Sequence, residues 1–222
     1  MVVSRGTYIR RRITVFGAVG IVFSVLLYLP MSLLAPLEPI APVLISVSAP
    51  ENPIVELDWP GNGSAAIGAV GYRGVLAHGS DTSPRPIASI TKVITALVVL
   101  DEKPLAPGES GPVITMTQHD VTRYQWQIAH NGSAKPVAPG VKFTQRELLD
   151  IVLIASANNY AETMARWAFG SEESFLVAAR AWLDAHGLGG IHLVDSTGLD
   201  PRNTATPADL IELGKLALAN PL

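Results

Sequence analysis

The chain has 222 residues, of which 48% are hydrophobic and 16% charged, and its formal net charge is −3. This length suits one sizeable domain with a small additional segment, and the slight acidity argues against nucleic acid as a partner, because nucleic-acid binding needs a basic face. There is no cysteine, so the fold does not depend on disulfides, and the five histidines lack metal-ligand spacing, so we expect no metal site.

The N-terminus has the pattern of a membrane anchor. Residues 1–12 hold four arginines, and residues 13–37 carry no charge. An apolar stretch of about 20 residues crosses the hydrocarbon core, and basic flanks stay cytoplasmic. We therefore expect a cytoplasmic segment over 1–12, a single transmembrane helix over 13–37, and an extracytoplasmic remainder held at the cell membrane. An uncleaved anchor is favoured over a cleaved signal, because the small-x-small triplet at 47–49 lies far from the apolar core.

The next segments predict a spacer, a hairpin and the first helix of a domain. Residues 38–63 are rich in proline and predict an extended spacer. Two short apolar runs within 64–78 meet at Gly71-Tyr72-Arg73-Gly74, which predicts a β-hairpin. After a loop over 79–86, a strongly apolar helix is expected to run to about Leu100.

Proline and glycine recur through residues 103–140. A strand over 113–116 and a short helix from Asp120 are expected there. Tyr124 and Trp126 are expected to anchor this stretch on the core rather than to line a groove.

Residues that favour helix ends divide the rest of the chain. Thr144-Gln145-Arg146-Glu147 is a capping box, and the apolar residues that follow it predict a helix buried on nearly all sides. Further caps come from Ser171 and from Thr206 followed by Pro207. Helices are predicted over 145–155, 159–170, 172–186 and from 207 onwards. We therefore expect an α/β (α+β) domain over 64–222, in which a hairpin precedes a mostly helical region.

Two short motifs carry candidate catalytic groups. Ser89-Ile90-Thr91-Lys92 opens the first helix, and because residues three apart share a helix face, Lys92 is placed to take the Ser89 proton. Apolar surroundings disfavour the ammonium and make a lysine a base. Ser156-Ala157-Asn158 lies at a break between two helices, where simple capping is one explanation. In the catalytic explanation, Ser156 relays a proton to the leaving amine, and Asn158 hydrogen-bonds Lys92 and the substrate amide.

These motifs resemble those of the serine-type D-alanyl-D-alanine carboxypeptidases, the low-molecular-mass penicillin-binding proteins. Residues 88–97 are similar to the nucleophile helix of that family, 154–161 to its second motif, and 197–200 and 206–210 to the region that follows. The resemblance covers about 64–222. It implies a β-lactamase/transpeptidase-like fold, in which helices flank a sheet and a helical subdomain forms one wall of the cleft.

The resemblance also implies an activity. Ser89 would attack the D-Ala-D-Ala carbonyl of peptidoglycan stem peptides, form an acyl-enzyme and lose it to water. β-Lactams, which mimic that dipeptide, would acylate the same serine, with Lys92 and Ser156 as catalytic groups and Asn158 binding substrate. No cofactor is implied.

The family's third motif, a Lys-Thr-Gly on a strand, has no match before Leu222. Ser196-Thr197-Gly198 lacks the basic residue and is interpreted as a turn. We therefore expect the chain to be a fragment that stops before the C-terminal strands and is inactive as given. A natural pseudoenzyme and one half of a split protein are the alternatives.

Other functions remain open from the sequence. A class A β-lactamase shares the first two motifs but needs a glutamate that activates the deacylating water, and Glu162, Glu172 and Glu173 do not have suitable positions. A D,D-endopeptidase or transpeptidase of the same fold is a second alternative. A non-catalytic, membrane-tethered peptidoglycan-binding pseudoenzyme is a third.

Overall fold

The computed structural model describes residues 5–35 and 56–222. The chain divides into two compact units, Met1–Val55 and Glu56–Leu222. Most of the expected spacer over 38–63, and the whole of the 47–49 triplet, lie outside the described residues.

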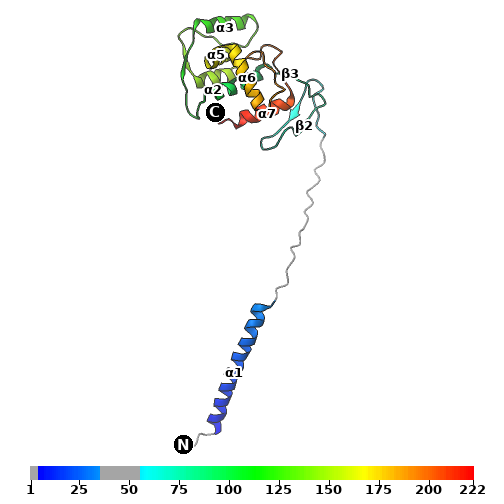
Figure 1. Ribbon diagram of the computed structural model, residues 1–222, viewed down its shortest axis with the longest axis vertical. Helices are drawn as coiled ribbons and strands as arrows, with labels where there is room; N and C mark the ends of the chain where they lie inside the picture. Colours follow the sequence, from blue (N-terminus) through cyan, green and yellow to red (C-terminus); the bar gives the residue numbers. More distant parts are fainter. Residues whose placement is uncertain (1–4, 36–55) are drawn as a thin grey trace. The chain divides into compact units, whose positions relative to one another are not determined.

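The described part of the first unit is the helix α1 (Arg5–Leu34), drawn in blue in Figure 1. Its most apolar window has a mean hydropathy of 2.2, so by length and composition the helix is able to cross a membrane. Thr14 and Ser24 donate their hydroxyl hydrogens to carbonyls four residues earlier, which satisfies these polar groups within the helix. A signal sequence near an N-terminus has the same properties, so α1 fits either an anchor or a signal.

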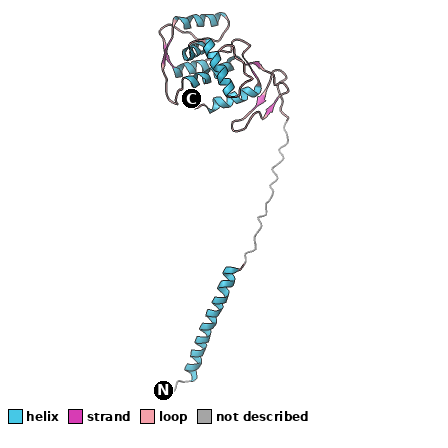
Figure 2. Cartoon of the chain, in the orientation of Figure 1, coloured by secondary structure: helices cyan, strands magenta, loops and turns pink. Residues whose placement is uncertain are grey.

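The second unit is mostly helical, and its strands are short (Figure 2). In chain order its elements are β1 (Ala66–Ile67), β2 (Ala77–His78), β3 (Arg85–Pro86), the 3₁₀ turn η1 (Ala88–Ile90), α2 (Thr91–Glu102), β4 (Val113–Thr115), α3 (Gln118–Ala129), β5 (Lys142–Thr144), α4 (Gln145–Ile154), α5 (Asn158–Phe169), α6 (Glu172–Ala185), β6 (Thr204–Ala205) and α7 (Pro207–Ala219).

Within residues 56–222 the strands form three antiparallel pairs. β1 pairs with β2, as the hairpin prediction expects, and β4 pairs with β5. The third pair joins β3 to β6, which places Arg85 opposite Ala205. Because β3 immediately precedes Ser89, this pair brings the segment before β6 close to the start of α2.

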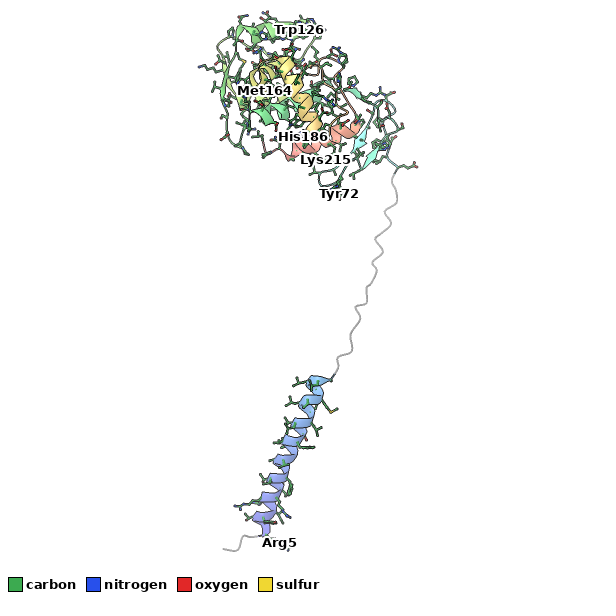
Figure 3. The ribbon with its side chains drawn as sticks, in the orientation of Figure 1. Arg5, Tyr72, Trp126, Met164, His186 and Lys215 are labelled. Carbon is green, nitrogen blue, oxygen red and sulfur yellow. The ribbon has the colours of Figure 1, made fainter. Side chains whose placement is uncertain are left out.

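The helix α2 lies between two apolar clusters, one on each of its faces. Ala96 and Val99 pack with side chains of α4 and α5, among them Met164. Ile94 and Val98 pack with side chains of α6 and α7, among them Phe175. Figure 3 shows Met164 inside the unit. The burial of both faces fixes the position of α2 and of the residues at its N-terminus.

The predicted helix ends are confirmed to within a few residues. The predicted burial of α4 on nearly all sides is not confirmed. The Thr144 capping box is present, Gly170 closes α5 with a φ of 86°, and Ser171 and Thr206 cap the last two helices. The expectation that α4 is buried nearly all round is wrong. Leu148, Leu149 and Val152 are buried, whereas Leu153 is 48% exposed and Ile154 84% exposed. The helix therefore packs through one face only, and it carries apolar side chains outside that face as well.

A buried carboxylate joins α3 to α5. Asp120 closes the capping box at the start of α3 with Thr117, and its Oδ1 accepts hydrogen bonds of 2.6 Å from Thr163 and Arg166 of α5. Burial alone would raise the pKa of Asp120, but these hydrogen bonds outweigh it and lower the pKa to about 2. The carboxylate therefore stays ionised at neutral pH and holds the two helices together.

Candidate active site

Ser89 and Lys92 lie at the junction of η1 and α2. Ser89 is in the 3₁₀ turn rather than in the α-helix that the sequence predicts, and Lys92 is in the first turn of α2. Residues three apart are nearly eclipsed in a 3₁₀ turn, and the Lys92 Nζ lies 3.1 Å from the Ser89 Oγ. Ser89 is exposed, whereas Lys92 is only 2% exposed, so the hydroxyl is accessible and the amine is enclosed.

The burial of Lys92 changes its chemistry. Removal from water disfavours the ammonium and lowers the pKa of Lys92 from 10.5 to about 8, against an opposing attraction from the Asp195 carboxylate. A neutral amine at 3.1 Å is able to accept the hydroxyl proton, which a charged ammonium is not. The pair therefore has the geometry and the proton affinity of a nucleophile and its base.

A turn over residues 195–200 provides the second partner of the amine. Lys92 Nζ donates to the Thr197 carbonyl at 2.7 Å, and Thr95 Oγ1 donates to the Ser196 carbonyl at 2.8 Å. The Asp195 carboxylate accepts hydrogen bonds from the backbone N–H groups of Thr197, Gly198 and Asp200. The turn therefore supplies the buried Lys92 amine with a hydrogen-bond acceptor in place of water.

Glu172 holds the same turn from the opposite side. This residue, in the first turn of α6, accepts from the Ser196 N–H at 2.7 Å and from the Ser196 hydroxyl at 3.0 Å. Burial raises the pKa of Glu172, although the bonds from Ser196 partly oppose this. The turn is thus fixed between α2 and α6.

Gly198 packs directly against the residue before the nucleophile. Its φ is +78°, and a Cβ built on it would lie 1.7 Å from the Ala88 carbonyl oxygen. Ala88 itself has a φ of 45°, a left-handed conformation that is costly for a residue with a Cβ. Such strain persists only where the surroundings enforce it, and the contact with Gly198 is one such constraint on the Ser89 backbone.

Ser156 reaches the nucleophile from the loop between α4 and α5. Its Oγ donates to the Ser89 Oγ at 2.9 Å, and its φ of 52° is also left-handed. The structure therefore brings Ser89, Lys92 and Ser156 together across 67 residues of chain.

Asn158 has a different partner from the one expected. Its side-chain Nδ2 donates to Gln127 Oε1 of α3 at 2.9 Å, and its backbone N–H donates to the Ser133 carbonyl. Among the hydrogen bonds of the described residues, none joins Asn158 to Lys92, whose amine donates instead to Ser89 and to the Thr197 carbonyl. The expectation of a direct bond between Asn158 and Lys92 is therefore not met.

A cavity of about 680 Å³ lies next to the hydrogen-bond partners of Lys92 and Asn158, although Ser89, Lys92, Ser156 and Asn158 are not themselves in its lining. It is bounded by α3, by the junction of α5 and α6, and by the turn that holds Lys92; Thr197 and Gln127 are in its lining. Trp126 also lines it, is 39% exposed, and carries the Arg123 guanidinium over its ring. Figure 3 shows Trp126 at the outer edge of the unit, so the expectation that it anchors a loop on the core is wrong.

Several residues around the site were not identified from the sequence. Glu172, Gln127 and Glu162 act through contacts with distant segments, whereas Asp195 forms its hydrogen bonds within its own turn and attracts the Lys92 ammonium electrostatically. The one local signal is an aspartate followed by Thr197-Gly198, which favours a turn closed by the aspartate side chain. No group of His, Asp or Glu able to hold a metal ion occurs among residues 5–35 and 56–222.

Comparison with known proteins gives consistent matches. A family model described as D-alanyl-D-alanine carboxypeptidase matches residues 69–220. A D-alanyl-D-alanine endopeptidase of Pseudomonas aeruginosa is 33% identical over 128 residues, which cover 58% of this chain and 38% of that protein. The D-alanyl-D-alanine carboxypeptidase DacB2 of Mycobacterium tuberculosis is 32% identical over 151 residues, covering 67% and 47%. The chain thus spans less than half the length of these curated relatives.

Solved structures agree in fold. A crystal structure of a D-alanyl-D-alanine carboxypeptidase from Mycobacterium tuberculosis H37Rv has a TM-score of 0.58 and 27% identity, covering 71% of this chain and 55% of that one. The Streptomyces K15 DD-transpeptidase has a TM-score of 0.57 at 24% identity, covering 66% and 56%. The expected transpeptidase-like α/β fold is confirmed.

Substitution of Gly198 tests the packing of the nucleophile turn. We expect Gly198→Ala to lower the free energy of unfolding by more than about 2 kcal/mol, because it adds a backbone clash to an unfavourable φ. Gly187→Ala is the matched control: its φ is +70° and nothing lies within 4 Å of the added Cβ, so it should cost about 1 kcal/mol. Equal losses in denaturant titrations would show that the Ala88 contact is unimportant.

Proposed function

Because the chain belongs to the D-alanyl-D-alanine carboxypeptidase family, we propose that it is a serine-type D-Ala-D-Ala carboxypeptidase acting on peptidoglycan stem peptides. The observation that carries the proposal is the exposed Ser89 hydroxyl between the buried Lys92 amine and the Ser156 hydroxyl. The proposed catalytic residues are Ser89, Lys92 and Ser156, and Asn158 binds substrate.

In the proposed acylation, the neutral Lys92 amine takes the proton as the Ser89 Oγ attacks the carbonyl carbon of the penultimate D-alanine. The carbon–nitrogen bond then breaks, and the departing amine of the terminal D-alanine receives a proton through Ser156. The positive end of α2, which begins at Thr91 just after the turn that holds Ser89, favours the negative charge that develops on the carbonyl oxygen. Water next attacks the ester, and the Ser89 oxygen regains its proton. A β-lactam would form the same ester.

A D,D-endopeptidase is the second candidate, since the relative in Pseudomonas aeruginosa, at 33% identity, is named a D-alanyl-D-alanine endopeptidase. Both activities use the same acyl-enzyme and differ in the amine that leaves. A carboxypeptidase releases free D-alanine, whereas an endopeptidase releases a second stem peptide from a cross-link.

Labelling with penicillin and analysis of the reaction products test this proposal. A labelled penicillin should add its mass to the peptide carrying Ser89, and a pentapeptide ending in D-Ala-D-Ala should lose one D-alanine. Ser89→Ala should lose both reactions while keeping its far-UV circular dichroism.

The other outcomes discriminate between the candidates. Cleavage of cross-linked dimers without release of D-alanine would identify the endopeptidase. Rapid loss of the penicillin adduct would indicate a β-lactamase. An adduct that persists in Ser89→Ala would refute the proposed nucleophile.

The acylation rate should depend on the ionisation of Lys92. Because burial lowers the pKa of this lysine to about 8 and the base must be neutral, the rate should rise with pH and level off above about 9. At pH 7 it should be about tenfold below the plateau. Stopped-flow acylation between pH 6 and 10 measures this profile. A flat profile would contradict a Lys92 base with a pKa near 8, and a profile that rises only above pH 10 would show that burial does not lower the pKa of this lysine.

We also propose a single-pass location in the cell membrane, with residues 1–12 cytoplasmic, 13–37 spanning, 38–63 as spacer and 64–222 outside. The support is α1 with its basic N-terminal flank. Mass spectrometry of the N-terminus of the mature protein should find residues 13–37 retained in the membrane fraction. A mature chain that begins after residue 37 would identify a cleaved signal instead.

A further inference from the structure

The side-chain amide of Asn158 is the last member of a hydrogen-bonded chain. Arg123 donates to both oxygens of Glu162, at 2.7 and 2.8 Å. Glu162 Oε1 in turn accepts from Gln127 Nε2 at 2.7 Å, and Gln127 Oε1 accepts from Asn158 Nδ2 at 2.9 Å. This series of hydrogen bonds therefore runs from α3 to α5, back to α3, and ends at Asn158 in the Ser156-Ala157-Asn158 motif.

The chemistry of this chain permits only one orientation of each amide. An amide has a donor end and an acceptor end that exchange when the group turns by 180°, whereas a carboxylate paired with a guanidinium only accepts. Gln127 must therefore direct its Nε2 to Glu162 and its Oε1 to Asn158. Asn158 must then direct its Nδ2 to Gln127, which turns its Oδ1 away from Gln127.

The remaining acceptor of Asn158 is available to a ligand. Among residues 5–35 and 56–222, no hydrogen bond ends on Asn158 Oδ1, and this atom is not one of the fully buried polar atoms without a partner. The atom is therefore not completely enclosed, although Asn158 as a whole is only 4% exposed, and it belongs to the residue two positions after Ser156, whose hydroxyl lies 2.9 Å from the nucleophile.

Close packing keeps the pair of amides in place. Gln127 is 1% exposed and Asn158 4% exposed. A Cβ on Gly132 would lie 2.0 Å from Gln127 Oε1 and 3.0 Å from Asn158 Nδ2, so the Gly132 backbone covers the bond between them. Gln127 is hydrogen-bonded at both ends of its amide and Asn158 at its Nδ2, and a flip of either amide is resisted because it would oppose two donors or two acceptors.

We propose that Glu162 and Gln127 are positioning residues that hold the Asn158 carbonyl oxygen toward the substrate. Arg123 fixes the Glu162 carboxylate. Because Gln127 must donate its Nε2 hydrogen to that carboxylate, it presents its Oε1 to Asn158 and so sets the orientation of the Asn158 amide. The substrate side rests on the proposed function, in which Asn158 Oδ1 accepts a hydrogen bond from a stem-peptide N–H.

A double-mutant cycle on the folded protein tests the orientation. Asn158→Asp puts a carboxylate oxygen against Gln127 Oε1, and Gln127 cannot turn to donate because Glu162 also accepts. We expect at least a tenfold fall in the folding equilibrium constant. In the Glu162→Gln background the Gln127 amide is free to turn. The fall in the folding equilibrium constant caused by Asn158→Asp should therefore be at least fivefold smaller in that background.

Asn159→Asp is the matched control, because Asn159 is buried on the same helix and bonds the backbone N–H and carbonyl of Lys135. That carbonyl cannot exchange donor for acceptor, so Glu162→Gln should leave the cost of Asn159→Asp unchanged within twofold. If Glu162→Gln reduced the stability loss equally for Asn158→Asp and Asn159→Asp, it would act only by removing a charge. If it did not reduce the loss for Asn158→Asp, Gln127 would not set the orientation of Asn158. Either result overturns the proposal.

Kinetics on the same variants separate positioning from loss of folded protein. With Asn158 intact, Glu162→Gln lets the amide turn, so KM for a stem peptide should rise about twofold with kcat unchanged. A lower kcat with unchanged KM would indicate only less folded enzyme and would overturn the positioning role. The unfolding cycle does not depend on catalysis, so absence of penicillin labelling at Ser89 would refute the proposed function without affecting the cycle.

Discussion

The burial of one lysine amine constrains this whole domain. Lys92 lies at the start of a helix packed on both faces, where an amine is stable only if its hydrogens find acceptors. One acceptor, Ser89, is three residues away, and the other, the Thr197 carbonyl, is 105 residues away. The position of the turn over 195–200 is therefore as important to the nucleophile as the helix that carries it.

Three elements hold that turn in place. The pairing of β3 with β6 joins the segment before Ser89 to the segment after the turn. Asp195 closes the turn from within, and Glu172 at the start of α6 holds Ser196 from outside. Because Gly198 then lies against the Ala88 carbonyl, the turn constrains the backbone of the nucleophile as well as its base.

The far side of the site depends on carboxylates that join α3 to α5. Asp120 fixes the start of α3 against Thr163 and Arg166, and Glu162 holds Arg123 and Gln127. An exposed ion pair contributes little to stability. These carboxylates are mostly enclosed, and each satisfies several donors at once. They place α3 so that Gln127 reaches Asn158, and the same helix contributes Trp126 to the adjacent cavity.

The sequence by itself determined the features that depend on residues within about four positions of one another. These are the ends of the helices, the capping box at Thr144, and the approach of Lys92 to Ser89 within one helical turn. Only the tertiary structure decided which face of α4 is exposed, which acceptor receives the Lys92 hydrogen, and which amide Asn158 binds. Helix caps and contacts between residues three or four apart depend only on the backbone conformation of a short segment, so its own residues specify them. The partner of a buried polar group, in contrast, is whichever distant segment the packing of the helices brings within 3 Å of it.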